Sequence, residues 1–160
     1  MKLIRNISIV VVSVAIALTL WFIFSNSLTP SAKSLETSEG IYEQVKDPIE
    51  AVVGEGKVTH SVFRKMAHFF EFFVLGIEVA LLFTLIFGLK LNNLIWIFIS
   101  GISVGIIDES LQNISKRTAS VTDVFIDVAG FALAVVISYG IYALFKFLKK
   151  KIKSNKERID

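Results

Sequence analysis

Four long apolar segments constrain the fold of this chain more than any other feature. They cover residues 7–24, 66–89, 91–107 and 124–145. A helix needs about 20 mostly apolar residues to cross the hydrocarbon core of a bilayer. Within lipid, a helix also satisfies its own backbone hydrogen bonds. The sequence therefore predicts an all-α membrane protein, a bundle of four transmembrane helices in a single domain covering residues 1–160.

The composition agrees with this class and excludes several others. Hydrophobic residues make up 54% of the chain and charged residues 19%, against about 45–50% and about 25% in a soluble domain. We therefore expect neither a soluble enzyme nor a nucleic-acid-binding protein. The absence of cysteine excludes disulfides and cysteine nucleophiles. Lys2 and Arg5 precede the first apolar segment, as in a signal peptide. Its length, its bulky residues and the lack of an A-x-A site after it predict a retained span.

The basic residues outside the spans predict the orientation of the bundle. The tail 146–160 contains seven Lys or Arg residues and two acidic ones. Lys2 and Arg5 precede the first span, and Lys90 lies between the second and third. With four spans, all of these fall on one side of the membrane, which the positive-inside bias assigns to the cytoplasm. We therefore predict that both termini are cytoplasmic and that residues 25–65 and 108–123 lie outside.

The first of these outer loops, residues 25–65, has two open interpretations. Leu35, Ile41, Tyr42 and Val45 recur at about helical spacing, as in an amphipathic helix that lies on the membrane. A solvated linker explains the same residues equally well. In both cases, the one proline and two glycines of residues 48–56 are expected to end any longer helix.

Polar residues inside the predicted spans mark the candidate functional region, because ionisable groups in a membrane are costly. At about 100° per residue, Arg64, His68, Glu71 and Glu78 share one face of the second span. We expect Glu71 to orient His68, one turn away. For Glu78, we expect a polar neighbour such as Ser100 or Ser103 of the third span.

The third and fourth spans carry their acidic residues at the predicted outer ends. Gly101 and Gly105 form a G-x-x-x-G step that permits close helix packing. We predict one outward-facing polar pocket in which Arg64 or Arg117 pairs with Asp108, Asp123 or Asp127; the alternative is that such pairs only lock the bundle. The candidate pocket residues are Arg64, Lys65, His68, Glu71, Asp108, Glu109, Gln112, Arg117, Asp123 and Asp127. We expect no metal and no cofactor, since His68 is the only histidine in this set.

Several of these segments resemble motifs of the VanZ-like family of bacterial membrane proteins. Residues 64–72 resemble its R-K-x-A-H-F-x-E-aromatic motif, residues 108–112 its D-E-x-x-Q element, and residues 123–130 its D-V-x-x-(N/D)-x-x-G stretch. Residues 24–27 resemble its F-S-x-S segment. The order and spacing of these motifs over residues 20–135 agree with those of the family.

The resemblance implies a small multi-pass protein of the bacterial cytoplasmic membrane, in a family whose namesake is linked to teicoplanin-type antibiotic resistance. It does not imply a particular reaction. The chain departs from the family pattern in one place. Residues 113–116 read Asn-Ile-Ser-Lys, where the family often has Phe-x-Pro-Gly. This departure predicts the loss of a rigid turn before Arg117.

Three hypotheses about function follow. The first is a non-enzymatic protein that binds or handles a membrane lipid, a lipid-linked cell-wall intermediate or a lipoglycopeptide antibiotic. The second is an intramembrane hydrolase or transferase in which His68, oriented by Glu71, is the general base. The third is a structural partner of a cell-wall complex that makes contact through residues 31–60. Four spans are few for a solitary transporter, so a homodimer is also expected.

Overall fold

The computed structural model describes residues 2–54, 56–88, 90–117 and 120–156, and these form five α-helices and no strand. In chain order the helices are α1 (Lys2–Ser27), α2 (Ser31–Val53), α3 (His60–Phe87), α4 (Leu91–Ile114) and α5 (Val121–Lys156). All except α2 are long and apolar enough to cross a membrane. The all-α class and the four membrane-spanning helices are therefore confirmed.

The helices extend beyond the predicted apolar segments at every boundary except two, the end of α3 and the start of α4, which begins at the predicted Leu91. α3 ends at Phe87, where Gly88 adopts a φ of 72°, so the segment predicted to end at residue 89 runs past the helix. α5 continues through the basic tail as far as Lys156. Residues 89 and 157–160, which belong to the second predicted span and to the predicted tail, lie outside the described residues, as do the side chains of Lys153 and Lys156.

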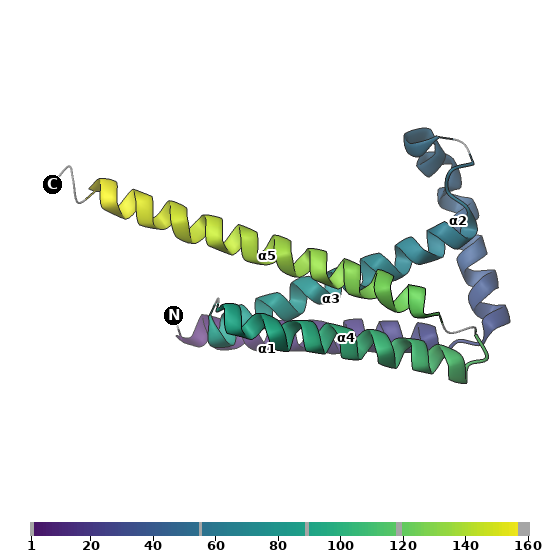
Figure 1. Ribbon diagram of the computed structural model, residues 1–160, viewed down its shortest axis with the longest axis horizontal. Helices are drawn as coiled ribbons and strands as arrows, with labels where there is room; N and C mark the ends of the chain where they lie inside the picture. The colour runs from purple at the N-terminus through teal and green to yellow at the C-terminus, as the bar shows by residue number, and fades with distance from the viewer. Residues whose placement is uncertain (1, 55, 89, 118–119, 157–160) are drawn as a thin grey trace.

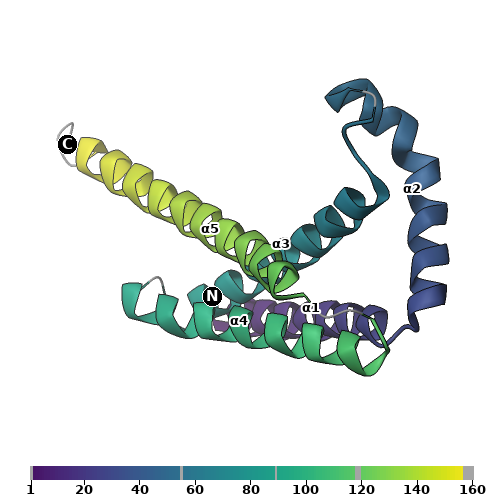
Figure 2. The same ribbon diagram turned by 45° about the vertical axis from the view of Figure 1, so that its right-hand side comes forward.

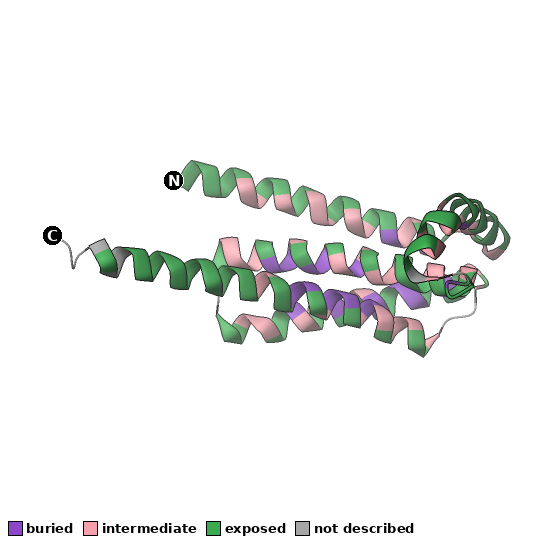
Figure 3. Cartoon of the chain, turned by 90° about the horizontal axis from the view of Figure 1, so that it is seen from above, coloured by how far each residue is buried: buried purple, intermediate pink, exposed green. Residues whose placement is uncertain are grey.

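The four long helices pack into a bundle, and α2 lies across one end of it (Figures 1 and 2). Both chain termini lie at the opposite end (Figure 1). The buried core is formed where the four long helices meet, and its fully buried side chains include Ile23, Phe72, Ile97 and Phe131. Residues 140–152 of α5 are exposed (Figure 3). The connections between α1 and α2, between α2 and α3 and between α4 and α5 therefore lie at the α2 end, whereas the connection between α3 and α4 lies at the other end.

Close packing between α3 and α5 depends on glycine. A Cβ atom on Gly130 would lie 2.2 Å from the carbonyl oxygen of Phe69, and one on Gly76 would lie 2.6 Å from that of Phe131. Small residues let helix backbones approach closely in lipid. In the predicted G-x-x-x-G step, only Gly101 is packed too closely to accept a side chain. A Cβ atom on Gly101 would lie 2.5 Å from the Phe131 ring, whereas one on Gly105 would lie 3.7 Å from its nearest neighbour.

A polar contact inside the membrane also joins α1 to α3. The hydroxyl of Thr19 donates a hydrogen bond of 3.0 Å to Oε1 of Glu78. The predicted serine neighbours of Glu78 are wrong, since Ser100 and Ser103 donate to carbonyl oxygens of their own helix. A hydroxyl in an apolar helix can satisfy itself in this way. Glu78 therefore takes its partner from α1 and not from α4.

The α2 helix is longer than the sequence predicted. Pro48 lies inside it and does not end it, and the helix stops at Val53, before Gly54 with a φ of 98°. Proline removes one backbone hydrogen bond, a loss that the rest of this helix tolerates. Tyr42 holds α2 to the start of α3, because its buried ring packs on Phe63 and its hydroxyl donates to the carbonyl of Val58 at 2.7 Å.

Candidate functional site

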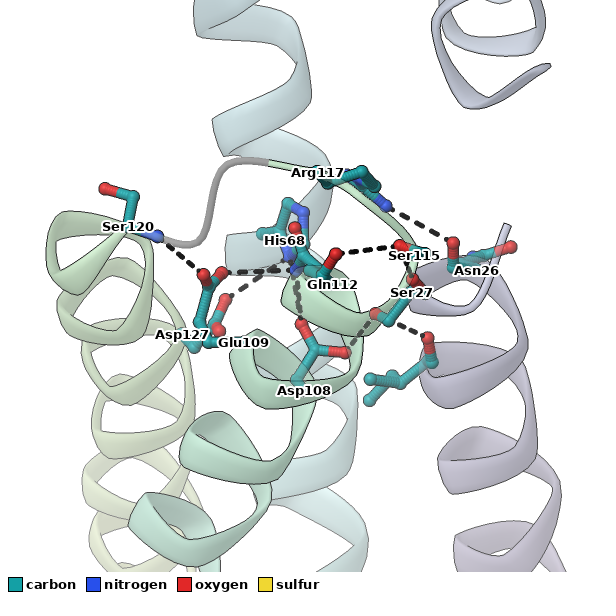
Figure 4. Close-up of polar contacts among 11 residues, drawn as sticks. Asn26, Ser27, His68, Asp108, Glu109, Gln112, Ser115, Arg117, Ser120 and Asp127 are labelled. Carbon is teal, nitrogen blue, oxygen red and sulfur yellow. Dashed lines mark hydrogen bonds and ion pairs between the residues drawn. The ribbon is translucent and has the colours of Figure 1, made fainter. Parts of the chain in front are cut away.

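Polar side chains from α1, α3, α4 and α5 converge at the α2 end of the bundle (Figure 4). Asp108 of α4 lies at the centre and is fully buried. One of its carboxylate oxygens accepts a hydrogen bond from the Ser27 hydroxyl, and the other accepts one from Gln112 Nε2 at 2.8 Å. Buried polar groups need such partners because desolvation is costly. Two helices therefore hold Asp108 in one orientation.

His68 of α3 faces two acids on two other helices (Figure 4). Its Nδ1 atom lies 3.8 Å from Asp108 Oδ2 and 3.6 Å from Asp127 Oδ1. These distances are too long for hydrogen bonds. Asp127 is fully buried, and neither of its oxygens has a hydrogen-bond partner among the described residues. We call His68, Asp108 and Asp127 the acid–histidine cluster.

This arrangement corrects two expectations from the sequence. Glu71, on the same helix as His68, forms no ion pair with it within 4.0 Å; the two aspartates take that place. Among the described residues, neither Arg64 nor Arg117 pairs with an acid within 4.0 Å. Helical spacing shows which residues share a face, whereas the rotation of the neighbouring helices decides which of them meet.

Glu109 and Gln112 organise the connection between α4 and α5. The Glu109 carboxylate accepts a hydrogen bond of 2.7 Å from the backbone N–H of Ser120, and a second bond of 3.1 Å from Gln112 Nε2. Both side chains are buried. Ser120 directly precedes α5, so Glu109 satisfies one of the free N–H groups at the start of that helix. The described hydrogen bonds of the Glu109 carboxylate are thus all to other residues of the protein.

The predicted loss of the turn before Arg117 is wrong. Lys116 has a φ of 60°, its N–H bonds to the Asn113 carbonyl, and the N–H of Arg117 bonds to the Gln112 carbonyl. This pair of bonds defines a Schellman motif, which usually has glycine in the left-handed position. The Ser115 hydroxyl also donates to the carbonyl of Ser27, at 2.8 Å. A different sequence therefore forms an ordered turn that positions Arg117.

Two neighbouring cavities open beside this network. The polar cavity, of about 340 Å³, is lined mainly by charged and polar side chains, among them Lys65, Gln112 and Asp123. The amphipathic cavity, of about 480 Å³, has the apolar residues Phe22, Ile41 and Phe63 in its wall, together with Glu71. Arg64, His68 and Arg117 line both cavities.

The two arginines present like charges to the same space. Burial lowers the pKa of the Arg117 guanidinium below its ordinary value, and the nearby Arg64 charge lowers it further. The described contact of Arg117 is a hydrogen bond of 3.3 Å to the carbonyl of Asn26, which carries no full charge. Two half-buried cations without a paired anion form a surface that attracts anions.

All ten predicted residues are thus found at this end of the bundle, in two groups. Those that line a cavity are Arg64, Lys65, His68, Glu71, Gln112, Arg117 and Asp123. Asp108, Glu109 and Asp127 lie behind the cavity walls, in the buried network. Sequence reasoning missed the roles of Ser27 and Ser115, which join α1 to α4. The F-S-x-S segment contained a signal for Ser27, but helical periodicity gave none for Ser115.

A sequence model described as VanZ/LLP1 matches residues 12–146. The chain belongs to the VanZ/LLP1 family. The resemblance that the motifs indicated is therefore confirmed, and every residue of the cavities and of the buried network of this VanZ/LLP1 protein falls inside the match. Comparison with curated proteins and with solved structures found no match.

Proposed function

We propose that this VanZ/LLP1 protein binds an amphiphile with an anionic headgroup, a membrane lipid or a lipid-linked cell-wall intermediate, between Arg64 and Arg117. One observation carries the proposal: both guanidinium groups line both cavities, and neither has an ion-pair partner within 4.0 Å among the described residues. A phosphate between them would offset their repulsion, and arginine forms bidentate hydrogen bonds with phosphate oxygens.

The amphipathic cavity supports a ligand with an apolar part. Phe22 of α1, Ile41 of α2 and Phe63 of α3 lie in the same wall as the two arginines. A lipid matches this cavity, because it has a charged headgroup attached to an apolar chain. A teicoplanin-type lipoglycopeptide also combines an acyl chain with ionised groups, and it is the second source of this chemistry.

The proposal places the cavities on the outer side of a bacterial cytoplasmic membrane. It is supported by the basic residues at the opposite end of the bundle, where Lys90 and Lys149 are exposed, as the positive-inside bias expects of the cytoplasmic side. The chain contains no cysteine, so single cysteines report on topology without background. A thiol reagent that cannot cross the membrane should label Glu39→Cys on α2 in intact cells and should label Lys149→Cys only after lysis. The reverse pattern would contradict the orientation.

The headgroup proposal is tested with purified protein in nanodiscs. A polyprenyl phosphate should bind, whereas the matching polyprenol, which lacks only the phosphate, should not. Arg64→Ala and Arg117→Ala should each weaken binding about tenfold or more, the size expected when a charge-assisted hydrogen bond is lost. Lys57→Ala, an exposed cation at the same end, is the matched control. Equal binding of the alcohol, or unchanged affinity in both arginine variants, would overturn the proposal.

Teicoplanin, added in competition, separates the two ligand sources. Displacement of the polyprenyl phosphate by teicoplanin, lost in the arginine variants, would assign the antibiotic to the same site. Absence of displacement would leave the lipid as the ligand.

A second candidate function, a lipid-directed hydrolase, is favoured by the position of His68. Its ring reaches both cavities and lies within 4.0 Å of two carboxylates, an arrangement in which a histidine can take a proton from water or a hydroxyl. The test is release of inorganic phosphate from a polyprenyl diphosphate by the purified protein. Turnover that is lost in His68→Gln supports the hydrolase; binding without turnover removes it.

A further inference from the structure

We infer that His68, Asp108 and Asp127 form a binding site for a divalent first-row metal cation, of which Zn²⁺ and Mn²⁺ suit the donors best. The three side chains come from α3, α4 and α5, and each directs one donor atom toward a common point (Figure 4). The sequence analysis expected no metal, and no short motif joins these donors, which are 40 and 19 positions apart along the chain. The inference goes beyond headgroup binding and does not depend on it.

The spacing of the donor atoms suits a cation. The three atoms lie within 4.8 Å of one another, and Nδ1 of His68 is 3.8 and 3.6 Å from the two carboxylate oxygens. A cation about 2.1 Å from each donor separates neighbouring donors by roughly 3.0–3.4 Å at octahedral or tetrahedral angles. The two histidine–carboxylate distances exceed that range by about 0.2–0.8 Å, and the widest donor separation by up to about 1.4 Å, so binding requires the aspartate side chains to close on the cation.

Asp127 supplies an independent reason to expect a ligand. It is fully buried, it points toward His68, and both of its oxygens are without a hydrogen-bond partner among the described residues. Nδ1 of His68 is buried and equally without one. A buried carboxylate is costly to leave unsatisfied. A cation would satisfy both groups at once.

The charges balance around a divalent cation. Two buried aspartates carry two negative charges, and histidine binds metal as the neutral imidazole. Carboxylate oxygens favour harder cations such as Mn²⁺, and imidazole favours Zn²⁺. A mixed set of one nitrogen and two oxygens suits either ion and disfavours Cu⁺, which prefers sulfur ligands.

The surroundings of the cluster resemble those of a metal site. Ser27 and Gln112 each donate a hydrogen bond to Asp108, which holds that carboxylate in place as outer partners of metal ligands do. Each carboxylate oxygen has two lone pairs, so the oxygen that accepts from Gln112 keeps one for a metal. His68 and Gln112 also line the polar cavity, from which water or an anionic oxygen could fill an open coordination position.

The test uses the purified full-length chain with its affinity tag removed, so that the only histidines are its own two. After dialysis against Zn²⁺ or Mn²⁺, elemental analysis and titration calorimetry measure the metal bound. We expect one ion per chain. His68→Gln and Asp127→Asn should each lower the affinity about tenfold or more. The matched control is Glu78→Gln, which alters a membrane-embedded acid bonded to Thr19 and outside the cluster.

A second measurement uses the native cluster, so that the test does not depend on the folding of a cluster variant. In a His60→Gln background, His68 is the only histidine of the chain. The pulsed electron paramagnetic resonance spectrum of bound Mn²⁺ should show coupling to one imidazole nitrogen, and ¹⁵N labelling of histidine should change it. Absence of stoichiometric metal, or bound metal without nitrogen coupling, would overturn the inference. Because polyprenyl phosphate binding is measured separately, failure of one proposal is distinguishable from failure of the other.

Discussion

The two ends of the helical bundle use charged residues in opposite ways. At the end that carries the termini, basic side chains such as Lys90 and Lys149 point away from the protein and are exposed. At the α2 end, Asp108 and Asp127 point inward and are fully buried. The same class of residue thus serves as a solvated rim at one end and as part of the packed interior at the other.

This difference distinguishes charged residues that keep their hydration from charged residues that need partners inside the protein. A lysine at the membrane surface keeps its hydration and is attracted to anionic lipid by about 1 kcal/mol. A buried carboxylate gives up its hydration, and the protein must replace it with hydrogen bonds or a counter-charge. Ser27 and Gln112 do this for Asp108, whereas Asp127 has no such bond among the described residues. Asp127 therefore carries the proposed metal site.

The largest expected effect comes from replacing a closely packed glycine of α5, compared with replacing a glycine further along the same helix. Gly130→Val should lower the free energy of unfolding by about 3 kcal/mol, because its first side-chain atom would lie 2.2 Å from the Phe69 carbonyl oxygen, which is backbone and cannot rotate away. The measurement is an SDS titration of the protein in bicelles. Gly140→Val is the control, since nothing lies within 4 Å of its Cβ position. Equal losses in both variants would refute the close packing of α3 and α5.

The second prediction removes one buried charge and one exposed charge. Asp108→Ala should lower the free energy of unfolding by about 2 kcal/mol, since the Gln112 amide and the Ser27 hydroxyl each lose one buried acceptor and keep only Glu109 and the Ile23 carbonyl. Lys149→Ala, at the exposed far part of α5, should change it by less than about 0.5 kcal/mol. The same titration, run with a chelator, measures both. Similar values for the two variants would erase the contrast between the ends.

The third prediction concerns the bond between α1 and α4 at the polar end. Ser115→Ala should cost about 1 kcal/mol, because the Ser27 carbonyl loses its donor at 2.8 Å. The control is Ser103→Ala, whose hydroxyl donates only to a carbonyl of its own helix. Thermal unfolding of the two variants in one detergent provides the comparison, and a larger loss in the control would contradict the role of Ser115.

The smallest expected effects come from substitutions in the two turns that end α4 and α3. Lys116 has a φ of 60°, and Gly88 has a φ of 72°. Lys116→Gly should raise the free energy of unfolding by about 0.5 kcal/mol, because the relief of left-handed strain exceeds the added entropy of the unfolded chain. Gly88→Ala should lower it by about 1 kcal/mol. The opposite signs, measured by thermal unfolding, check the geometry of both turns; a loss in Lys116→Gly would contradict it.

Helical periodicity predicted the candidate residues well and their partners poorly. It placed Arg64, His68 and Glu71 on one face of α3, and all three line the cavities. It paired His68 with Glu71, whereas the structure pairs it with acids of α4 and α5. Residues on one helix face lie at known positions, but a neighbouring helix that rotates by one residue, about 100°, presents a different side chain.

The sequence by itself determined the class of the protein and the region that matters. The lengths of the apolar segments require helices that span a bilayer, and the cost of burying charge singles out the polar residues at their ends. Only the tertiary structure decided that Asp108 and Asp127 meet at His68, and that Arg64 and Arg117 line one cavity with no ion-pair partner within 4.0 Å among the described residues. The physical reason is that hydrophobic periodicity describes the faces of one helix only. A site between helices depends also on how closely those helices approach and how they are rotated, which glycines such as Gly130 permit.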